Sequence, residues 1–257
     1  MKGESVANVR KVCVVTGSSS GIGAATVRLY AKNGWDIVVN YSRDAAPADA
    51  VAAECRALGA QTLVVRADIA ADADCRRLAV EVEQRFGRAD VLVNNAGTTK
   101  FVAAKDLDGL DVDDFQRIYA VNVIGAYQMV RALVPLIERS GGGAIVNVSS
   151  IASMMGTGSS LAYMASKGAL NALSVGLARS LAPQIRVNAI APGLVETKFA
   201  AAIVQNPMLR DHVVNRTPLQ RHAQPSELAG AAVYLLSDAA SFQTGSVMVV
   251  DGGFTAV

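Results

Sequence analysis

Short runs of apolar residues alternate along this chain with longer stretches whose apolar residues recur every three or four positions. The first pattern predicts buried β-strands and the second predicts amphipathic helices. The expected strands are 11–16, 36–40, 61–66, 91–93, 144–148, 185–190 and 246–250. The expected helices are 22–33, 46–58, 73–86, 112–139, 161–181 and 225–236.

Strands that are separated by helices pair in parallel, so the order predicts an α/β fold with one doubly wound parallel sheet of about seven strands, covered by helices on both faces. Pro135 predicts a kink near the end of helix 112–139. Segment 196–216 fits the alternation poorly and is expected to be a small helical lid. We expect residues 1–10 to be a flexible extension and 11–257 to be a single domain.

Composition excludes several classes of function. The 257 residues are 51% hydrophobic and 18% charged, which suits one large domain, and the net charge of +2 with scattered basic residues argues against nucleic acid. No signal peptide begins the chain, and no stretch approaches the roughly 20 apolar residues of a membrane helix. Three cysteines without CxxC spacing and two isolated histidines predict a reduced, cytoplasmic protein without a metal site.

A glycine-rich turn joins the first strand to the first helix, reading Thr16-Gly17-Ser18-Ser19-Ser20-Gly21-Ile22-Gly23. Glycine permits a tight turn and close approach of the backbone to a pyrophosphate, and the helix start offers N–H groups to the anion. The spacing differs from the commonest G-x-G-x-x-G pattern, and such turns also occur without ligands. Because this turn opens the first strand–helix–strand unit, we expect it to bind a dinucleotide.

Tyr163 and Lys167 stand one helical turn apart, and Ser150 follows the fifth predicted strand. A tyrosine hydroxyl has a pKa of about 10, and a cation on the same helix face would lower that pKa toward neutral pH. Ser150 could donate a hydrogen bond to a carbonyl oxygen that Tyr163 protonates. The trio therefore suits proton transfer at a carbonyl or alcohol oxygen while a hydride moves elsewhere.

Five motifs in order resemble the short-chain dehydrogenase/reductase family over nearly the whole chain. They are the glycine turn, the run Asn94-Asn95-Ala96-Gly97, the tetrad Asn122, Ser150, Tyr163 and Lys167, the segment Pro192-Gly193 with Thr197, and the tail Asp251-Gly252-Gly253. The pattern is most similar to the β-ketoacyl-carrier reductase and glucose dehydrogenase branches. The resemblance implies a Rossmann-type sheet and an oxidoreductase that moves a hydride between NADP(H) and a carbonyl or secondary alcohol.

The resemblance also implies roles for single residues. Tyr163 would be the general acid/base, Ser150 would polarise the carbonyl, and Asn122 would hold a water linked to Lys167. Asp68 and Ile69 would meet the adenine, while Val195 and Thr197 would hold the nicotinamide amide. The expected cofactor contacts are Gly17, Ser19, Ser20, Gly21, Ile22, Gly23, Tyr41, Ser42, Arg43, Asp68, Ile69, Asn95, Ala96, Gly97, Tyr163, Lys167, Pro192, Gly193, Val195 and Thr197.

Each of these residues also has an ordinary structural interpretation. Asn122 could bond neighbouring backbone, Lys167 could be a solvated helix charge, and Ser150 or Asp68 could cap a turn. These interpretations give no reason for all four catalytic residue types to stand at matching positions. A dinucleotide-binding regulatory or scaffold protein without catalysis remains the alternative function.

The second strand ends in Asn40-Tyr41-Ser42-Arg43, without the carboxylate that NAD enzymes place there. Arg43 could bind a 2′-phosphate, so NADP(H) is the expected cofactor, with NAD(H) possible. Ser20, where many NADP-dependent relatives carry a basic residue, weighs against this, and Arg43 could be a solvated loop charge.

Phe199, Met154 and Met155 suggest an apolar substrate pocket, although each could be ordinary core. The basic residues expected for an acyl-carrier substrate are offset, and a sugar, steroid or small ketone remains open. By resemblance we expect a homotetramer built from helices 112–139 and 161–181 and the last strand.

Overall fold

The fold is built around one parallel sheet, and the computed structural model describes residues 10–256. The sheet has seven strands in the order β3-β2-β1-β4-β5-β6-β7. The strands are β1 (Val12–Val15), β2 (Asp36–Tyr41), β3 (Thr62–Arg66), β4 (Val91–Asn94), β5 (Gly143–Val148), β6 (Ile185–Pro192) and β7 (Val247–Val250). The prediction of a doubly wound parallel sheet is confirmed. The predicted N-terminal extension lies, apart from Arg10, outside the described residues.

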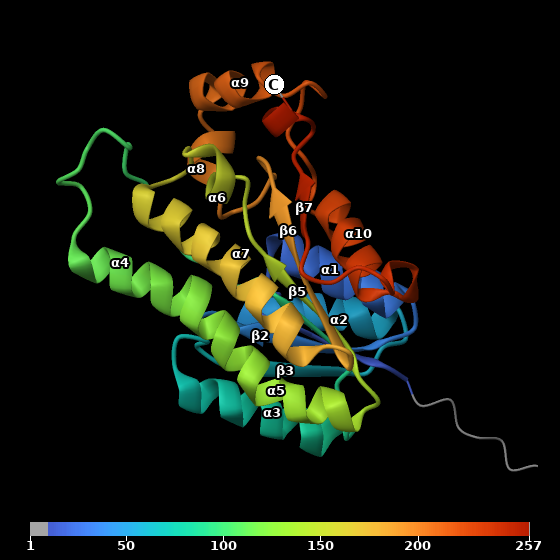
Figure 1. Cartoon of the computed structure of the whole chain (residues 1–257). Coiled ribbons are helices and arrows are strands. Elements are labelled where there is room, and N and C mark those ends of the chain that lie inside the picture. The colour runs from blue at the N-terminus through green and yellow to red at the C-terminus, as the bar shows by residue number, and fades with distance from the viewer. Residues whose placement is uncertain (1–9, 257) are drawn as a thin grey trace, which may run out of the picture.

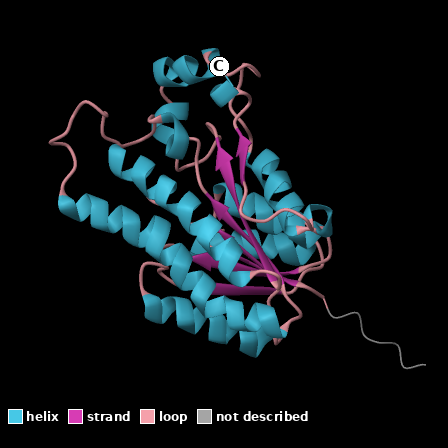
Figure 2. Cartoon of the chain, in the orientation of Figure 1, coloured by secondary structure: helices cyan, strands magenta, loops and turns pink. Residues whose placement is uncertain are grey.

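Helices cover both faces of the sheet (Figures 1 and 2). One core contains residues of α1 (Gly21–Lys32), α2 (Ala45–Ala57) and α10 (Pro225–Leu236). The other contains residues of α3 (Asp72–Phe86), α5 (Ala126–Arg139) and α7 (Leu161–Leu181). In β1, Cys13 and Val15 pack into the first core, whereas Val12 and Val14 pack into the second. Strands that are buried on both faces must be apolar throughout, which explains their uninterrupted hydrophobic runs.

The helix predicted at 112–139 contains an irregular turn. It consists of α4 (Val112–Tyr119), a π-helical segment η1 (Ala120–Gly125) and α5. The departure from α-helical geometry lies at η1, and α5 continues through Pro135 to Arg139. The kink expected at Pro135 remains a prediction. Single π-turns inside helices are often found at functional sites, and Asn122 lies within this one.

The segment predicted as a lid is helical. It contains α8 (Ala201–Val204) and α9 (Pro207–Asn215), which lie beyond the carboxyl ends of the strands near the end of the chain (Figure 1). Asn206 begins α9 by accepting hydrogen bonds from the N–H groups of Met208 and Leu209. A further short helix, α6 (Ala152–Met155), follows β5 and was not predicted.

One stretch requires a correction to the expectation about membrane helices. By length and composition alone, Val112–Arg139 would suffice to cross a membrane, because it contains an 18-residue window with a mean hydropathy of 1.4. In the fold, half of that window is buried. Packing within the protein therefore accounts for its apolar residues.

Cys13, Cys55 and Cys75 are all buried and unpaired within residues 10–256. Burial raises the pKa of Cys55 to about 11 and that of Cys75 to about 12, so both thiols stay protonated at neutral pH. In the same part of the chain, no group of three or more His, Cys, Asp or Glu side chains gathers as a metal site would require. The cytoplasmic location remains a prediction.

Candidate active site

Four of the sequence motifs meet at the carboxyl ends of the central strands. A Cβ on Gly17 would lie 2.9 Å from the Cα of Ala96, and one on Gly21 would lie 3.2 Å from the Thr197 methyl group. A Cβ on Gly97 would lie 3.7 Å from the Lys167 ammonium. The glycine turn, the Asn-Asn-Ala-Gly run, the catalytic helix and the start of the lid therefore border one site. In doubly wound sheets, ligands bind at this edge, where the strand order reverses.

The glycines of the turn adopt unusual φ angles and allow Asn95 to pack closely against the turn. Gly17 and Gly21 have φ angles of +60° and +56°, which other residues rarely adopt. A Cβ on Gly23 would lie 2.5 Å from the Asn95 amide nitrogen, which donates to the carbonyls of Thr16 (2.9 Å) and Gly17 (3.1 Å). Ser20, before α1, makes no side-chain cap hydrogen bond, so no side chain there competes for the first N–H groups of the helix.

Asn40, at the end of β2, fixes this turn and was not predicted as a site residue. Its Oδ1 accepts from the Gly17 N–H at 2.9 Å and its carbonyl accepts from the Ser18 N–H at 3.0 Å. Its Nδ2 donates to the carbonyls of Val65 (3.3 Å) and Ala67 (3.1 Å). A lone amide that ends an apolar strand is the signal that could have found it. Asn40 thus ties the turn to the end of β3.

Helix α7 carries Tyr163 and Lys167 and begins at Ser160, whose hydroxyl accepts from the Tyr163 N–H at 3.3 Å. Tyr163 is 9% exposed and Lys167 is 4% exposed. The Lys167 ammonium donates to the Val148 carbonyl at 2.7 Å and lies 5.7 Å from the centre of the Tyr163 ring. The Ser150 side chain lies near enough to the Tyr163 phenol to lower its pKa. The structure thus brings Ser150, Tyr163 and Lys167 together.

The pKa values in this site differ from the sequence expectation. Burial raises the pKa of Tyr163 to about 12, and the hydrogen bond with Ser150 acts in the opposite direction. The pKa of Tyr163 is therefore not lowered toward neutral pH as the sequence predicted, and burial also lowers the pKa of Lys167 to about 8. Desolvation outweighs the neighbouring charge here, since it disfavours both charged forms.

Asn122 is buried in η1 and its amide group is fully engaged. Oδ1 accepts from the Thr98 N–H at 2.8 Å, and Nδ2 donates to the Thr98 carbonyl and the Ser166 hydroxyl, both at 3.0 Å. The side chain therefore connects the loop after β4 with the catalytic helix. Its expected role in holding a water remains a prediction.

The backbone after β6 is oriented by a short bridge to residue 223. The Leu194 carbonyl accepts from the Ala223 N–H, and the Glu196 N–H donates to the Ala223 carbonyl, each at 2.9 Å. In a parallel bridge this pairing directs the N–H and carbonyl of Val195 away from Ala223. The Val195 carbonyl accepts a hydrogen bond from the Thr197 hydroxyl at 3.4 Å, and the contact of Val195 with a nicotinamide amide remains a prediction. At Gly193, two residues earlier, a Cβ would come within 2.9 Å of Asp251, so only glycine fits there without a shift.

The two residues expected near the adenine have other partners. Asp68 accepts from the Ala70 N–H at 3.0 Å and so forms the turn before α3. The Ile69 side chain is only 3% exposed and lies against Gly125, where a Cβ would come within 2.9 Å of it. The Ile69 side chain thus belongs to the core, and its contact with an adenine ring remains a prediction. An adenine contact of Asp68 remains a prediction.

Two arginines lie beside the end of β2. Arg43 is exposed, and Asp44, the nearest following carboxylate, caps α2 by accepting from the Ala46 N–H at 3.1 Å. Arg66 pairs with Tyr41 in the sheet register, and its Nε donates to the Ser42 carbonyl at 3.4 Å. Sequence reasoning missed Arg66. Its position at the end of the neighbouring strand was the available signal, because carboxyl ends of parallel strands share one edge.

The lid begins with an aromatic contact to the catalytic tyrosine. The rings of Phe199 and Tyr163 lie 5.8 Å apart, centre to centre, and are inclined by 43°. Phe199 remains 44% exposed and Met154 remains 49% exposed. Phe199 is thus a partly exposed apolar side chain beside the Tyr163 ring, where the substrate pocket is expected.

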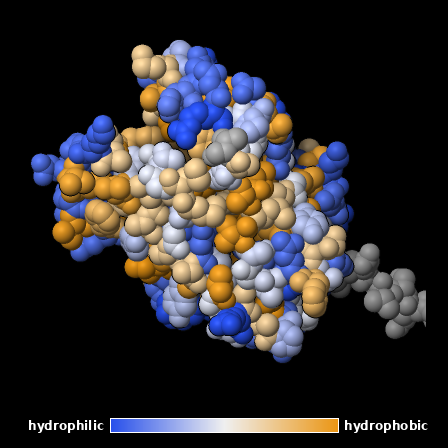
Figure 3. Space-filling view, turned by 45° about the horizontal axis from the view of Figure 1, so that its top comes forward, coloured by the Kyte–Doolittle hydropathy of each residue, from blue (hydrophilic) through white to orange (hydrophobic). Residues whose placement is uncertain are grey.

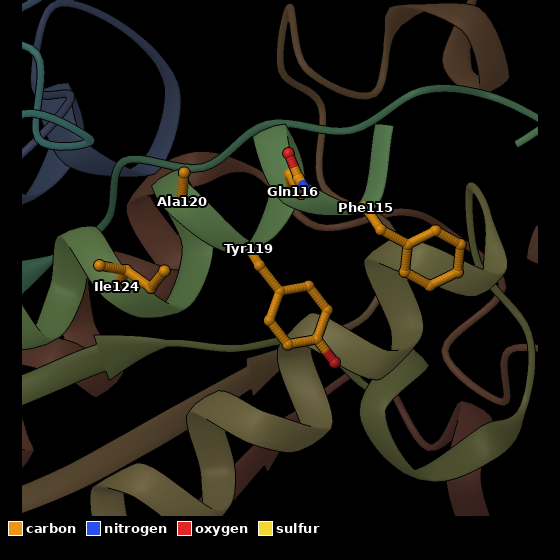
Figure 4. Close-up of a pocket in the computed structure, with 5 residues that line it drawn as sticks. All are labelled: Phe115, Gln116, Tyr119, Ala120 and Ile124. Atoms are coloured by element: carbon orange, nitrogen blue, oxygen red, sulfur yellow. The ribbon is translucent and has the colours of Figure 1, made fainter. Parts of the chain in front are cut away.

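A second apolar surface lies on the outer side of α4 and η1. Figure 3 shows hydrophobic residues interspersed with polar ones over the surface in view. Phe115, Gln116, Tyr119, Ala120 and Ile124 line a shallow depression, and Figure 4 shows the rings of Phe115 and Tyr119 projecting to the same side of the helix. Phe115, Ile124 and Tyr127 are each exposed. This surface is separate from the residues that surround Tyr163.

These features fit a dinucleotide. The glycines of the turn let it pack directly against Ala96, Thr197 and Asn95, and the α1 N-terminus suits a pyrophosphate. Lys167 directs one ammonium donor to the Val148 carbonyl, and an ammonium has two further donors. Gly17, Gly21, Gly23 and Val195 would hold the cofactor by backbone contacts, and Lys167 would hold it by its side chain.

Known proteins of similar sequence and structure agree with this geometry. A family model described as enoyl-(acyl carrier protein) reductase matches residues 17–255. The cis-4-hydroxycyclohexanecarboxylate dehydrogenase of Sinomonas cyclohexanicum is 39% identical over 248 residues, which cover 96% of this chain and 97% of that protein. A gluconate 5-dehydrogenase from Burkholderia cenocepacia J2315, in complex with NADP and tartrate, has a TM-score of 0.89 at 34% identity, with 96% of both chains covered.

A short-chain type dehydrogenase/reductase from Mycobacterium ulcerans has a TM-score of 0.90 at 30% identity, covering 96% of this chain and 90% of that one. These identities extend over almost the full length of each chain, so they establish more than a shared fold. Given the motifs gathered at the strand ends, the chain belongs to the short-chain dehydrogenase/reductase family and is an NAD(P)-dependent oxidoreductase.

Proposed function

We propose that Tyr163 is the general acid/base of a reversible carbonyl reduction that uses NADP(H). The observation that carries this proposal is the burial of Tyr163 and Lys167 side by side, with the Lys167 ammonium 5.7 Å from the centre of the phenol ring. Ser150 lowers the pKa of the same phenol, so its hydroxyl is placed to reach an oxygen that approaches the phenol. Such an oxygen belongs to a carbonyl in one direction and to a secondary alcohol in the other.

In the reductive direction, the Tyr163 hydroxyl donates its proton to the carbonyl oxygen while Ser150 donates a hydrogen bond to that oxygen. A bound nicotinamide supplies the hydride to the carbonyl carbon, or accepts it in reverse. The raised pKa of Tyr163 keeps the phenol protonated at neutral pH, ready to act as an acid. Lys167 stabilises the phenolate that remains after proton transfer, because a nearby cation favours the charged form.

The preference for NADP(H) is supported by charge at the end of β2. Arg43 follows the strand, Arg66 contacts the same segment, and Asp44 is committed to the cap of α2. A 2′-phosphate there would meet two guanidinium groups, whereas the ribose hydroxyls of NAD would find no carboxylate at the strand end. The NADP complex of the gluconate 5-dehydrogenase is compatible with this preference.

The substrate class proposed is a small molecule with a carbonyl or secondary alcohol. The matched relatives are named for an alicyclic hydroxy acid and for gluconate, and the family model is described by an acyl-carrier substrate. Phe199 and Met154 favour the alicyclic or acyl substrates over gluconate. Exposed apolar side chains at the entrance of a site bind apolar groups more favourably than polar ones.

The experiment follows absorbance at 340 nm with NADPH or NADP and a panel of four probes: cis-4-hydroxycyclohexanecarboxylate, gluconate, glucose and an acetoacetyl thioester. Wild type is expected to turn over at least one probe. Tyr163→Phe is expected to lose at least about a hundredfold in kcat while NADPH still binds. A fully active Tyr163→Phe variant would refute the role of Tyr163. A wild type that binds NADPH but is silent on every probe would favour the inactive binding protein instead.

We also propose that the protein forms a homotetramer. Exposed apolar residues on α4, η1 and α5 support one contact surface. The edge strand β7, with Val249 exposed and Phe242 106% exposed beside it, supports a second. Unpaired strand edges and apolar patches are usually covered, and two different surfaces on one chain are what a tetramer of two-fold symmetry requires.

A further inference from the structure

A pair of polar side chains links α6 to the catalytic helix. Asn171 lies one turn beyond Lys167 and two turns beyond Tyr163, on the same face of α7. Its Nδ2 donates to the Ser153 hydroxyl at 2.8 Å, and that hydroxyl donates to the Ser150 carbonyl at 2.6 Å. Two hydrogen bonds thus join the residue that faces the phenol to the helix that carries the phenol.

Helix stability does not explain Asn171. Its Oδ1 is inaccessible to solvent and has no hydrogen-bond partner within residues 10–256. A buried amide that is half satisfied lowers stability, and alanine or leucine at this position would favour the helix more. Ser153 alone could bond the carbonyl three residues earlier, as serines often do. The added bond from α7 therefore requires a separate reason.

We propose that Ser153 and Asn171 are positioning residues that hold Ser150 at the correct distance from Tyr163. The inference rests on the proposed roles of Ser150 and Tyr163. Ser150 precedes α6, a helix of a single turn, and the Ala152 N–H donates to its hydroxyl at 3.1 Å. So short a helix has little rigidity of its own. The bond to Asn171 fixes this turn to α7, so Ser150 and Tyr163 move as one unit.

This arrangement has a consequence for proton transfer. The Ser150 hydrogen bond lowers the pKa of Tyr163, against the effect of burial. Lys167 is the charged group that faces the same ring, from α7 itself. Loosening Ser150 would therefore raise the pKa of Tyr163 further and weaken polarisation of the carbonyl. Alcohol oxidation, which needs the phenolate, would then require a higher pH.

The test compares Ser153→Ala, Asn171→Ala and the double variant, using the alcohol of the four-probe panel that wild type oxidises fastest, with NADP. Each single variant is expected to lose about five- to tenfold in kcat, the size of one neutral hydrogen bond, with KM little changed. The pH profile of oxidation is expected to move to higher pH. The double variant is expected to be no worse than the worse single one, because one linkage is lost.

Two controls separate positioning from stability. Ser180→Ala removes a comparable serine, which bonds the Gly176 carbonyl near the exposed end of α7, and should leave kcat and the pH profile unchanged. Ser153→Thr keeps the hydroxyl and should restore both. The proposal would be overturned if the pH profile of the alanine variants is unshifted. This holds whether kcat is normal or is reduced in proportion to a lower melting temperature. Failure of the proposed function is seen separately, as an active Tyr163→Phe.

Discussion

The Nζ of Lys167 donates a 2.7 Å hydrogen bond to the backbone carbonyl of Val148, the last residue of β5. The ammonium is thereby held in the protein interior, against a residue that stands two positions before Ser150 in the sequence. A cation in this position is costly for the fold, since burial alone lowers its pKa from 10.5 to about 8. Stability therefore gives no reason for a lysine here, which supports the role proposed for it.

The first prediction is that Lys167→Met raises the free energy of unfolding at pH 7 by about 1–3 kcal/mol while abolishing turnover. Below pH 8, lysine is charged in both the folded and the unfolded chain, and the folded state bears the full cost. Between pH 8 and 10.5 the unfolded chain binds a proton that the folded chain has lost, so wild type gains stability as pH rises. The advantage of the variant should shrink across this range.

Urea unfolding at pH 7, 8, 9 and 10 measures this difference. Lys167→Arg serves as the control, because arginine stays charged over the whole pH range. The difference in unfolding free energy between the methionine and arginine variants should therefore not change with pH. A methionine variant that is no more stable than wild type at pH 7 would contradict the burial argument. So would an advantage that stays constant up to pH 10.

The second prediction concerns the glycine turn. A Cβ on Gly23 would meet the Asn95 amide at 2.5 Å and the Gly17 carbonyl at 2.9 Å. Gly23→Ala must displace Asn95 or widen the turn, so we expect a loss of about 1–3 kcal/mol in stability and at least tenfold weaker NADPH binding. Gly230→Ala is the matched control, because Gly230 is also helical and a Cβ there meets nothing within 4 Å.

The control should gain about 0.5–1 kcal/mol from better helix propensity and bind NADPH normally. Thermal melting and titration of NADPH fluorescence measure both quantities. If Gly23→Ala binds NADPH as tightly as wild type, the turn is not the cofactor cradle.

The sequence was sufficient to predict the fold because its apolar runs are long and end at clear signals. Helix 161–181 was predicted with the bounds that α7 has, and strand 36–40 differs from β2 by one residue. Both faces of the sheet are covered, so the strands are apolar throughout and easily distinguished from the periodic helices. The lid was recognised because its composition did not fit this alternation.

What could not be predicted depends on contacts between distant residues. The π-turn at Asn122 is accompanied by bonds to residues 24 and 44 positions away, and helical periodicity does not reveal one additional residue in a turn. The spacing of Tyr163 and Lys167 predicted that they are neighbours, but burial decides their pKa values and only the fold determines burial. Arg66 and Asn171 were missed for the same reason.

The third prediction is a loss of cofactor discrimination. Arg43→Ala should lower kcat/KM for NADPH about tenfold or more and leave that for NADH nearly unchanged, because only NADPH carries the 2′-phosphate. Arg66→Ala should have a smaller effect in the same direction, since its guanidinium also bonds the Ser42 carbonyl. Arg28→Ala, which removes an exposed arginine paired with Glu54, controls for net charge. A wild type that prefers NADH would defeat the proposed preference outright.

The last prediction concerns assembly. Ile124 is half exposed beside Phe115, and a glutamate in its place would put a charge into any contact made by this surface. Burying an unpaired carboxylate is strongly unfavourable, so Ile124→Glu should reduce the molar mass measured by light scattering from four chains to two. Two chains should remain because the β7 edge is a separate surface. Leu58→Glu, an equally exposed apolar position after α2, should leave the tetramer intact. A monomeric wild type, or a tetrameric Ile124→Glu variant, would show that this surface is free in solution.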